Sequence, residues 1–265
     1  MGFISIGNEQ LSYRKMGAGA RIALAFHGYG DNADTFELLE EPLKKEYTLL
    51  SFDLPHHGHS QWAPNAILTK TGLAALVTRV MTEYNVTKVS LLGYSLGGRI
   101  CATIITRLPA SIDKVVLVAP DGLKPNIYYS LFIRTGVGLK VFKHIMEHPE
   151  NYFRAIDWLM DRKLIDPTRY KFVMHSVGLE AGRKRLFRIW TCLKDITEQP
   201  EKIRAAINRH SIPVTIFMGA KDKIMPPFIA QKFKKGTRTV QVFVLDKGHR
   251  IIDHENAHQI AAHLL

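Results

Sequence analysis

The sequence predicts an α/β fold in which helices cover both faces of a mostly parallel sheet. Short apolar runs such as "KVSLLGY" and "KVVLVAP" alternate with helical segments in the first and last parts of the chain. These runs are apolar throughout, which is typical of strands buried on both sides. The alternation stops between residues 121 and 210, where every segment has helical spacing only. This interruption predicts an all-helical insertion within the α/β domain.

The individual elements follow from local patterns. At the start, "FISIG" and "LSYRKMG" indicate a hairpin, and "RIALAFHG" and "YTLLSFDLP" indicate strands that end at turn residues. Helices are expected from "FELLEEPLKKE", from "TKTGLAALVTRVMTEYN" with its Thr start, and from "LGGRICATIITRLP". The pattern resumes with the strands "PVTIFMGAKD" and "VQVFVLDKGH" and the helices "PPFIAQKFKKG" and "ENAHQIAAHLL". We therefore expect a core formed by residues 1–120 and 211–265, and a helical cap formed by residues 121–210.

The chain of 265 residues is strongly basic, with a formal net charge of +12 and a pI of about 9.7. More than half of this excess lies in the predicted cap. The charge favours an acidic partner: an anionic small-molecule acyl substrate, another carboxylate or a phosphate ester, an acidic carrier protein, or an anionic membrane surface. A basic surface without a binding role is the alternative. No nucleic-acid-binding module is recognisable, so nucleic acid is not expected as a partner.

The two cysteines, Cys101 and Cys192, lie far apart and indicate neither a disulfide framework nor a metal site. The first ten residues lack the pattern of a signal peptide, and no apolar run approaches the roughly 20 residues that span a bilayer. These features predict a cytoplasmic protein without stable membrane anchoring.

One motif indicates nucleophilic catalysis. Residues 93–97 read Gly-Tyr-Ser-Leu-Gly, which fits G-x-S-x-G, and they follow a predicted strand and precede a predicted helix. A sharp turn in that place forces the serine into a strained conformation, and flanking side chains would clash. The pattern predicts that the Ser95 hydroxyl is exposed at the start of the helix as a nucleophile.

A serine hydroxyl needs a base that is oriented by an acid. His249 and Asp222 both follow late predicted strands, so the sheet should bring them to Ser95 at its carboxyl edge. Asp121, after the strand "KVVLVAP", is an alternative acid, and Asp246 is expected to be structural.

An oxyanion hole would need two backbone donors. The N–H of Leu96, directly after the nucleophile, should be one, and the N–H of Tyr29 in the loop after "RIALAFHG" should be the other. His27 in the same loop is expected to shape the loop rather than to act as a base.

The chain resembles the α/β-hydrolase superfamily, in its capped single-domain form. The resemblance covers residues 20–120 and 211–265. It rests on five features in chain order: the loop at His27-Gly28, the "FDLPHHGHS" turn, the strand-to-helix turn "GYSLGG" (the nucleophile elbow), the loop of Asp222, and Gly248-His249. It implies an eight-stranded sheet with an inserted helical cap, and no cofactor or metal. The haloalkane dehalogenase and epoxide hydrolase branches of the superfamily use an aspartate nucleophile, so a serine at position 95 argues against both branches.

The turn departs from the family pattern D-x-P-G-x-G, and we assign the replacement of its first glycine to His57. His56, His57 and His59 also suggest a metal site. Their spacing lacks the H-x-H-x-D-H pattern of binuclear metallohydrolases, so a metal site is not expected.

Arg99 lies one helical turn after Ser95 and could hold a substrate carboxylate. The stretch "GYSLGGR" is similar to the elbow of the menaquinone-pathway succinyl-hydroxycyclohexadiene-carboxylate synthase, a lyase that uses the same triad. Substrate contacts are expected from four residues of this region and the cap, namely Tyr94, Arg99, Trp158 and Arg188.

The leading hypothesis is a serine hydrolase that cleaves a carboxylic ester or thioester of a small to medium acyl substrate through an acyl-enzyme. A lyase of the menaquinone-pathway type and a carbon–carbon hydrolase are alternatives that would use the same triad. A non-catalytic ligand-binding protein on the same fold is the third hypothesis.

Overall fold

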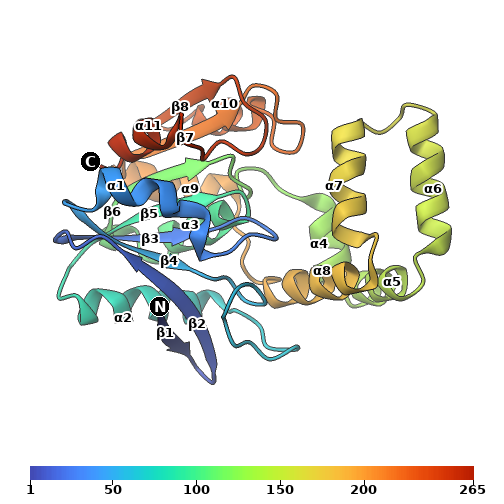
Figure 1. Cartoon of the computed structure of the whole chain (residues 1–265), viewed down its shortest axis with the longest axis horizontal. Helices are drawn as coiled ribbons and strands as arrows, with labels where there is room; N and C mark the ends of the chain where they lie inside the picture. Colours follow the sequence, from blue (N-terminus) through green and yellow to red (C-terminus); the bar gives the residue numbers. More distant parts are fainter. The chain divides into compact units, whose positions relative to one another are not determined.

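A computed structural model describes the backbone of residues 1–265 and every side chain except those of Ile127, Tyr128, Arg169 and Phe172. Over this part of the chain, eight strands form one sheet in the order β1-β2-β4-β3-β5-β6-β7-β8 (Figure 1). The strands are β1 (Gly2–Ile6), β2 (Glu9–Met16), β3 (Arg21–Phe26), β4 (Tyr47–Phe52), β5 (Val89–Tyr94), β6 (Ile112–Val118), β7 (Val214–Gly219) and β8 (Val240–Leu245). The predicted hairpin is confirmed, because β1 and β2 pair in antiparallel fashion.

The sheet is mostly parallel, as predicted. Only the pairs β1–β2 and β2–β4 are antiparallel among the described strands, and β3 to β8 run in the same direction as β4. Every parallel strand therefore ends at one edge of the sheet. Ligand sites of open α/β sheets form at this carboxyl edge.

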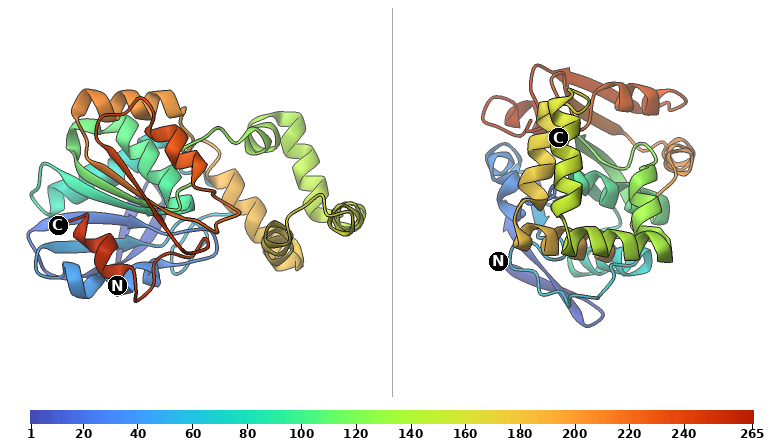
Figure 2. Two further views of the ribbon diagram at one scale, coloured as in Figure 1. Left: turned by 90° about the horizontal axis from the view of Figure 1, so that it is seen from above. Right: turned by 90° about the vertical axis from the view of Figure 1, so that its right-hand side faces the viewer.

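Helices cover both faces of this sheet, as Figure 2 shows. One face carries α2 (Lys70–Glu83), α3 (Leu96–Arg107) and α9 (Pro200–His210); the other carries the 3₁₀ helix η1 (Ala33–Leu39), α1 (Glu40–Leu43) and α11 (Ala257–Ala262). A short 3₁₀ turn, η2 (Pro109–Ser111), precedes β6, and α10 (Phe228–Lys234) packs against β8.

Successive side chains of each strand point to opposite faces of the sheet, so each strand contributes to both layers of the core. On β5, Leu92 and Tyr94 face the cluster that includes Phe36 of η1 and Ile260 of α11. β5 is buried along its whole length, so its alternate residues also have no access to solvent. Burying a Leu or Phe side chain stabilises a fold by about 1.5–3 kcal/mol, which explains why the strands are apolar on both sides.

The segment "FELLEEPLKKE" differs from the single helix that was predicted. It forms the 3₁₀ helix η1 followed by one turn of α-helix, α1. Pro42 gives the physical reason: in a continuous α-helix its ring would clash with the carbonyl of Leu38, and it has no N–H to donate.

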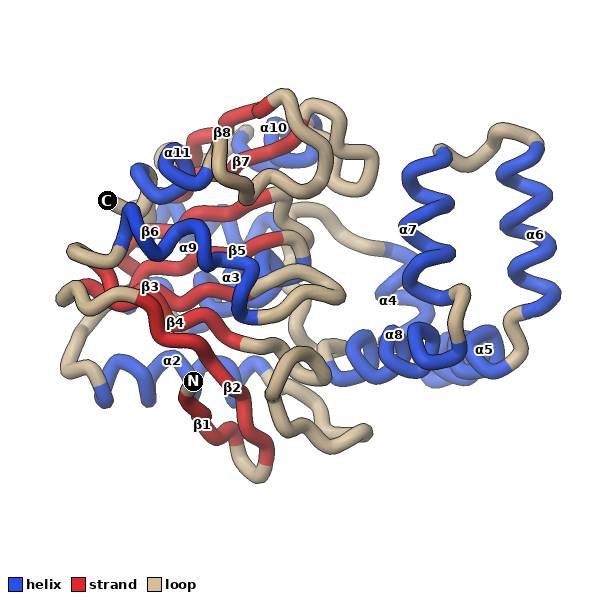
Figure 3. The backbone as a smooth tube through the Cα atoms, viewed as in Figure 1, coloured by secondary structure: helices blue, strands red, loops and turns tan.

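A second compact unit contains α4 to α8 and consists of residues 126–194 together with 64–67. Its helices are α4 (Ile127–Arg134), α5 (Gly136–Glu147), α6 (Glu150–Asp161), α7 (Pro167–Val177) and α8 (Glu180–Cys192), drawn in blue without strands in Figure 3. Asn126, Thr135 and Asp166 cap three of these helices through side-chain oxygens that accept backbone N–H groups. Phe142 stacks on Phe187 and Trp190 in its core, with ring centroids 5.6 and 5.3 Å apart.

These units differ in extent from the predicted division at residues 121 and 210. The helix α9 packs against α3 and belongs to the first unit, which comprises residues 1–63, 68–125 and 195–265. The assignment of the second unit as a cap stays a prediction. None of the described helices is both long enough and apolar enough to cross a membrane.

Candidate active site

Ser95 occupies a strained turn between β5 and α3. Its φ of 49° and ψ of −112° lie in a backbone region that residues other than glycine rarely adopt. A Cβ at Gly97 would overlap the carbonyl oxygen of Phe26, and one at Gly93 would lie 2.8 Å from Cys101 Sγ. The two glycines of the motif are therefore needed for close packing, as the sequence suggested.

Backbone hydrogen bonds hold this turn in place. The N–H of Ser95 donates to the carbonyl of Val118 at 2.9 Å, and its carbonyl accepts the N–H of Gly98 at 2.9 Å and that of Asp121 at 2.8 Å. Because β6 and the start of α3 both contribute, the position of Ser95 depends on the packed sheet rather than on a loose loop.

The structure brings the three distant residues of the predicted triad together. His249 Nε2 lies 2.9 Å from Ser95 Oγ, and His249 Nδ1 lies 2.7 Å from Asp222 Oδ2. The Asp222 side chain is fully buried, and its other oxygen accepts the N–H groups of Ile224 and Met225 at 2.8 and 2.9 Å. The carboxylate is thus fixed by the backbone and directs one oxygen at the imidazole. This chain of hydrogen bonds has the geometry in which a histidine accepts a serine proton.

Tyr94 packs against His249, and its predicted contact with substrate stays a prediction. Its side chain is buried, its ring centroid is 5.5 Å from that of His249, and its hydroxyl donates to the His249 carbonyl at 3.4 Å. Burial raises the pKa of the Tyr94 hydroxyl well above its usual value. Tyr94 therefore supports the loop that carries His249.

Leu96 is the first residue of α3, so its N–H has no acceptor within the helix. Tyr29 lies in the loop after β3, in a turn where the N–H of Asp31 donates to the carbonyl of Gly28 at 3.3 Å. Asp31 also forms an ion pair with Arg250, which links this loop to the segment of His249.

His27 lies at the end of β3 and is fully buried. Its Nδ1 is 2.7 Å from the carbonyl oxygen of Gly28, and its Nε2 accepts the N–H of Leu54 at 3.0 Å. Both ring nitrogens are bonded to the backbone, which agrees with the expected structural role.

In the turn after β4, the predicted position of the replaced glycine is wrong. Counting the pattern D-x-P-G-x-G from Asp53 places the first glycine at His56, not at His57. The structure agrees, because His56 has a φ of 62°, in the left-handed region that favours glycine. His57 is instead a buried residue whose two nitrogens lie close to the Pro55 carbonyl and the Gly30 N–H.

Asp53 organises this turn. Its carboxylate accepts hydrogen bonds from Ser12 Oγ at 2.6 Å, from the N–H of Ala33 at 2.7 Å and from the N–H of His59 at 2.8 Å. Burial by itself raises the pKa of Asp53, but the hydrogen bonds from Ser12, His59 and Ala33 outweigh it and lower the pKa below its usual value.

Arg99 and Asp121 form a buried ion pair. The side chains are 8% and 14% exposed, and Arg99 Nη2 contacts Asp121 Oδ2. The other carboxylate oxygen accepts the N–H of Gly122 at 2.7 Å. The arginine considered for a substrate carboxylate and the alternative triad acid are thus each other's partners. Asp246, the remaining acid, pairs with Lys221 at the surface.

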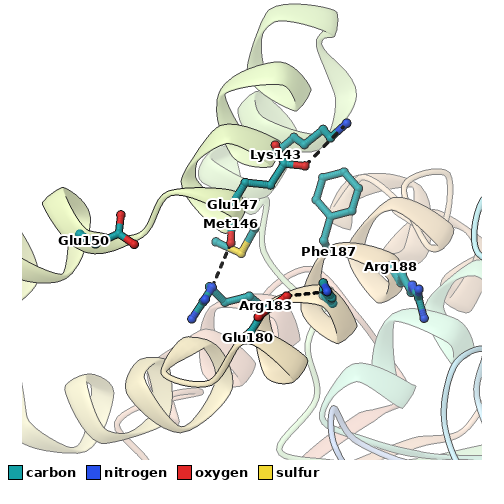
Figure 4. Close-up of a pocket in the computed structure, with 9 residues that line it drawn as sticks. Lys143, Met146, Glu147, Glu150, Glu180, Arg183, Phe187 and Arg188 are labelled. Carbon is teal, nitrogen blue, oxygen red and sulfur yellow. Dashed lines mark hydrogen bonds and ion pairs between the residues drawn. The ribbon is translucent and has the colours of Figure 1, made fainter.

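Two predicted substrate residues lie in the second unit. Trp158 on α6 is 51% exposed, with the guanidinium of Arg162 4.8 Å from its ring centroid. Arg188 on α8 is exposed and lines a cavity of about 480 Å³ within this unit (Figure 4). Their contact with substrate stays a prediction.

The other cations of that cavity have structural partners. Arg183 Nε donates to the Met146 carbonyl at 2.9 Å, at the last turn of α5 (Figure 4). Lys184 pairs with Glu180 at 2.5 Å. Arg183 Nη1 also donates to the Val177 carbonyl at the end of α7. These contacts place the cations at helix ends and in surface pairs, where they stabilise the helical unit.

No cluster of three or more His, Cys, Asp or Glu side chains suited to a metal ion occurs among the residues that the structure describes. In the turn with three histidines, both nitrogens of His57 already lie within hydrogen-bond distance of backbone groups.

The family model of the alpha/beta hydrolase family matches residues 23–263. The chain belongs to the α/β-hydrolase family. The match includes every strand from β4 to β8 and all residues of the candidate site, so fold and family agree.

Individual relatives of this α/β hydrolase are distant. It is 28% identical over 251 residues to a dihydrolipoyllysine-residue acetyltransferase component of an acetoin cleaving system from Cupriavidus necator, covering 93% of this chain but only 63% of the relative. It is 23% identical over 263 residues to the uncharacterized hydrolase YugF of Bacillus subtilis, covering 93% and 89% of the two chains. Among solved structures, MGS-M2, an α/β hydrolase enzyme from a deep-sea metagenome library, matches with a TM-score of 0.69 and 16% identity, covering 99% and 96%.

The pairing of Arg99 with Asp121 in this α/β hydrolase was not predicted from the sequence. A signal was present: Arg99 stands in the apolar helix "LGGRICATII", and a charged side chain inside a buried helix requires a counter-ion. The contact of His57 with the loop after β3 was also not predicted, because no sequence spacing reveals it.

Proposed function

We propose that this α/β hydrolase is a serine hydrolase that cleaves a carboxylic ester or thioester through an acyl-enzyme. The observation that carries the proposal is the continuous hydrogen-bonded chain from Asp222 through His249 to Ser95, with Ser95 held in a strained turn. A buried carboxylate that fixes an imidazole against a serine is suited to activating that serine.

The proposed reaction has two halves. In the first, Ser95 Oγ attacks the acyl carbon while its proton passes to His249 Nε2. The bond to the alcohol or thiol then breaks, and His249 gives the proton to the leaving group. In the second half, a water molecule loses a proton to His249 as it attacks the acyl carbon, and Ser95 recovers that proton when the carboxylic acid leaves.

Two backbone donors would stabilise the oxyanion that forms in both halves. Leu96 at the start of α3 offers an N–H at the positive end of a helix, and we propose Tyr29 in the loop after β3 as the second donor. Asp222 would hold the imidazole in one tautomer and stabilise its charged form. The high net charge of +12 agrees with an anionic acyl substrate or an acidic carrier.

The buried pair of Arg99 and Asp121 weighs against the lyase hypothesis. An arginine that neutralises a protein carboxylate has less charge to offer a substrate carboxylate, and removing it from that pair would leave Asp121 buried without its counter-ion. Carbon–carbon hydrolases share this triad geometry and differ in the pocket around it.

The direct test is a panel of p-nitrophenyl esters and acyl thioesters of graded acyl length, with the menaquinone-pathway intermediate included. We expect turnover of esters or thioesters, and a fall in kcat of at least about 10³-fold in Ser95→Ala. Full activity of Ser95→Ala would contradict the proposal. Turnover of the menaquinone-pathway intermediate alone would replace hydrolase by lyase.

A further inference from the structure

His57 is tied to two different loops through its two ring nitrogens. Nδ1 lies 2.9 Å from the carbonyl oxygen of Pro55, and Nε2 lies 3.2 Å from the backbone nitrogen of Gly30. A carbonyl only accepts and a backbone N–H only donates, so Nδ1 carries the proton and Nε2 is the acceptor. His57 as a whole residue is 2% exposed, which protects both hydrogen bonds from water.

The loop that His57 contacts is the one that carries Tyr29. Gly30 directly follows Tyr29, and its φ of 83° marks a turn that glycine favours. Within the loop, the turn from Gly28 to Asp31 is closed by a hydrogen bond of 3.3 Å that does not involve the Gly30 N–H. The bond from Gly30 to His57 therefore adds a constraint that the turn does not supply itself.

The two rings reinforce this arrangement. The Tyr29 ring meets the His57 ring edge-on, with centroids 6.2 Å apart and planes at 88°. The His57 ring also meets the His27 ring in a T-shaped contact, with centroids 4.9 Å apart. His27 is in turn bonded to the backbone of Gly28 and Leu54. The loops after β3 and β4 are thus joined by two histidines in contact.

We propose that His57 is a positioning residue that holds the backbone N–H of Tyr29 in place as an oxyanion donor. This inference rests on the proposed function. His57 acts through the peptide bond between Tyr29 and Gly30. Because the Gly30 N–H is bound to His57 Nε2, the backbone of Tyr29 cannot rotate freely. Preorganised donors are effective because no reorganisation is needed as charge develops on the substrate oxygen.

Two conservative variants separate the positioning role from general packing. In His57→Gln, the side-chain amide oxygen can reach toward the Nε2 position and accept from Gly30. In His57→Asn, the shorter amide can still donate to Pro55 but leaves Gly30 without its acceptor. His59→Asn, an exposed change in the same loop, is the matched control.

We expect kcat of His57→Asn to fall about 10–100-fold on the best ester, with KM changed by less than about threefold. His57→Gln and His59→Asn should remain within about threefold of the unmodified protein. The affinity for a trifluoromethyl ketone, which forms an oxyanion on Ser95, should fall with kcat/KM in His57→Asn. Circular dichroism and thermal unfolding show whether each variant is folded.

Unchanged kcat in folded His57→Asn would overturn the inference. It would also be overturned if His57→Gln lost as much kcat as His57→Asn while the affinity for the ketone stayed constant, because His57 would then serve packing alone. Failure of the proposed function looks different: the unmodified protein would neither turn over esters nor react with a fluorophosphonate, and both proposals would fall.

Discussion

The guanidinium of Arg99 is ion-paired with the carboxylate of Asp121 at a place where both side chains are largely buried. The pair joins α3, which begins beside Ser95, to the loop that follows β6. Removing one partner leaves a buried charge without compensation, whereas replacing both by apolar groups does not.

A double-mutant cycle tests this relationship. Arg99→Met should lower the free energy of unfolding by about 3 kcal/mol, and Arg99→Met with Asp121→Leu should recover to within about 1 kcal/mol of the unmodified protein. Denaturant unfolding measures each value. For esters with and without a carboxylate on the acyl group, the ratio of kcat/KM should be unchanged in Arg99→Met. A tenfold loss confined to the carboxylate ester would show that Arg99 binds substrate.

The identity of the triad acid can be decided by comparing two isosteric changes. Asp222→Asn places an amide where the Nδ1–H of His249 needs an acceptor with negative charge, and kcat should fall about 10³–10⁴-fold. Asp121→Asn should lower the melting temperature but leave kcat within about threefold. Steady-state kinetics on one ester suffices. A larger loss in Asp121→Asn than in Asp222→Asn would exchange their roles.

Gly97 should tolerate no side chain. A Cβ there would overlap the Phe26 carbonyl oxygen, which is held in the sheet, so Gly97→Ala should destabilise the protein by about 3 kcal/mol or more. Gly136, at the start of α5, has nothing within 4 Å of an added Cβ and serves as the control. Gly136→Ala should be neutral or stabilise by up to about 1 kcal/mol. Thermal unfolding of the two variants would contradict this account if their order were reversed.

Asp53 should make the stability of the protein depend on pH in the acid range. Its folded pKa lies below its ordinary value, so its contribution is complete above the unfolded pKa and is lost as pH falls through the folded pKa. Asp53→Asn should therefore lower the unfolding free energy by about 2 kcal/mol at neutral pH.

The difference between Asp53→Asn and the unmodified protein should shrink below pH 3.8, the ordinary pKa of this carboxyl group. Denaturant unfolding at several pH values measures it. A difference that stayed constant from neutral to acid pH would mean that the carboxylate charge contributes nothing to the turn.

Much of the fold could be predicted because local patterns decide it. The apolar run of β5 predicts a buried strand, and the glycines around Ser95 predict a tight turn. Both signals are local, and the structure has the expected strand, turn and helix there. Asp222 and His249 were predictable from topology, since parallel strands end at a common edge.

Other features depend on neighbours that are distant in sequence. The pairing of Arg99 with Asp121 requires knowing that the start of α3 lies beside the loop after β6. The contact between His57 and Gly30 likewise arises only when β3 and β4 lie side by side. The replaced glycine of the turn was assigned one residue too late, to His57. The positive φ of His56 shows that His56 occupies the glycine position.

The boundaries of the helical unit also could not be predicted from local sequence patterns. Helical spacing continues through α9, so periodicity alone cannot separate α9 from α8. The packing of α9 against α3 assigns it to the first unit.

The most direct test of the central claim is the intact mass of the protein after reaction with a fluorophosphonate. An activated serine should take up one phosphonyl group, and peptide mapping should place it on Ser95. Ser95→Ala should gain no mass, and His249→Ala should react far more slowly. A folded unmodified protein that stays unlabelled, or a Ser95→Ala variant labelled to the same extent, would contradict the account.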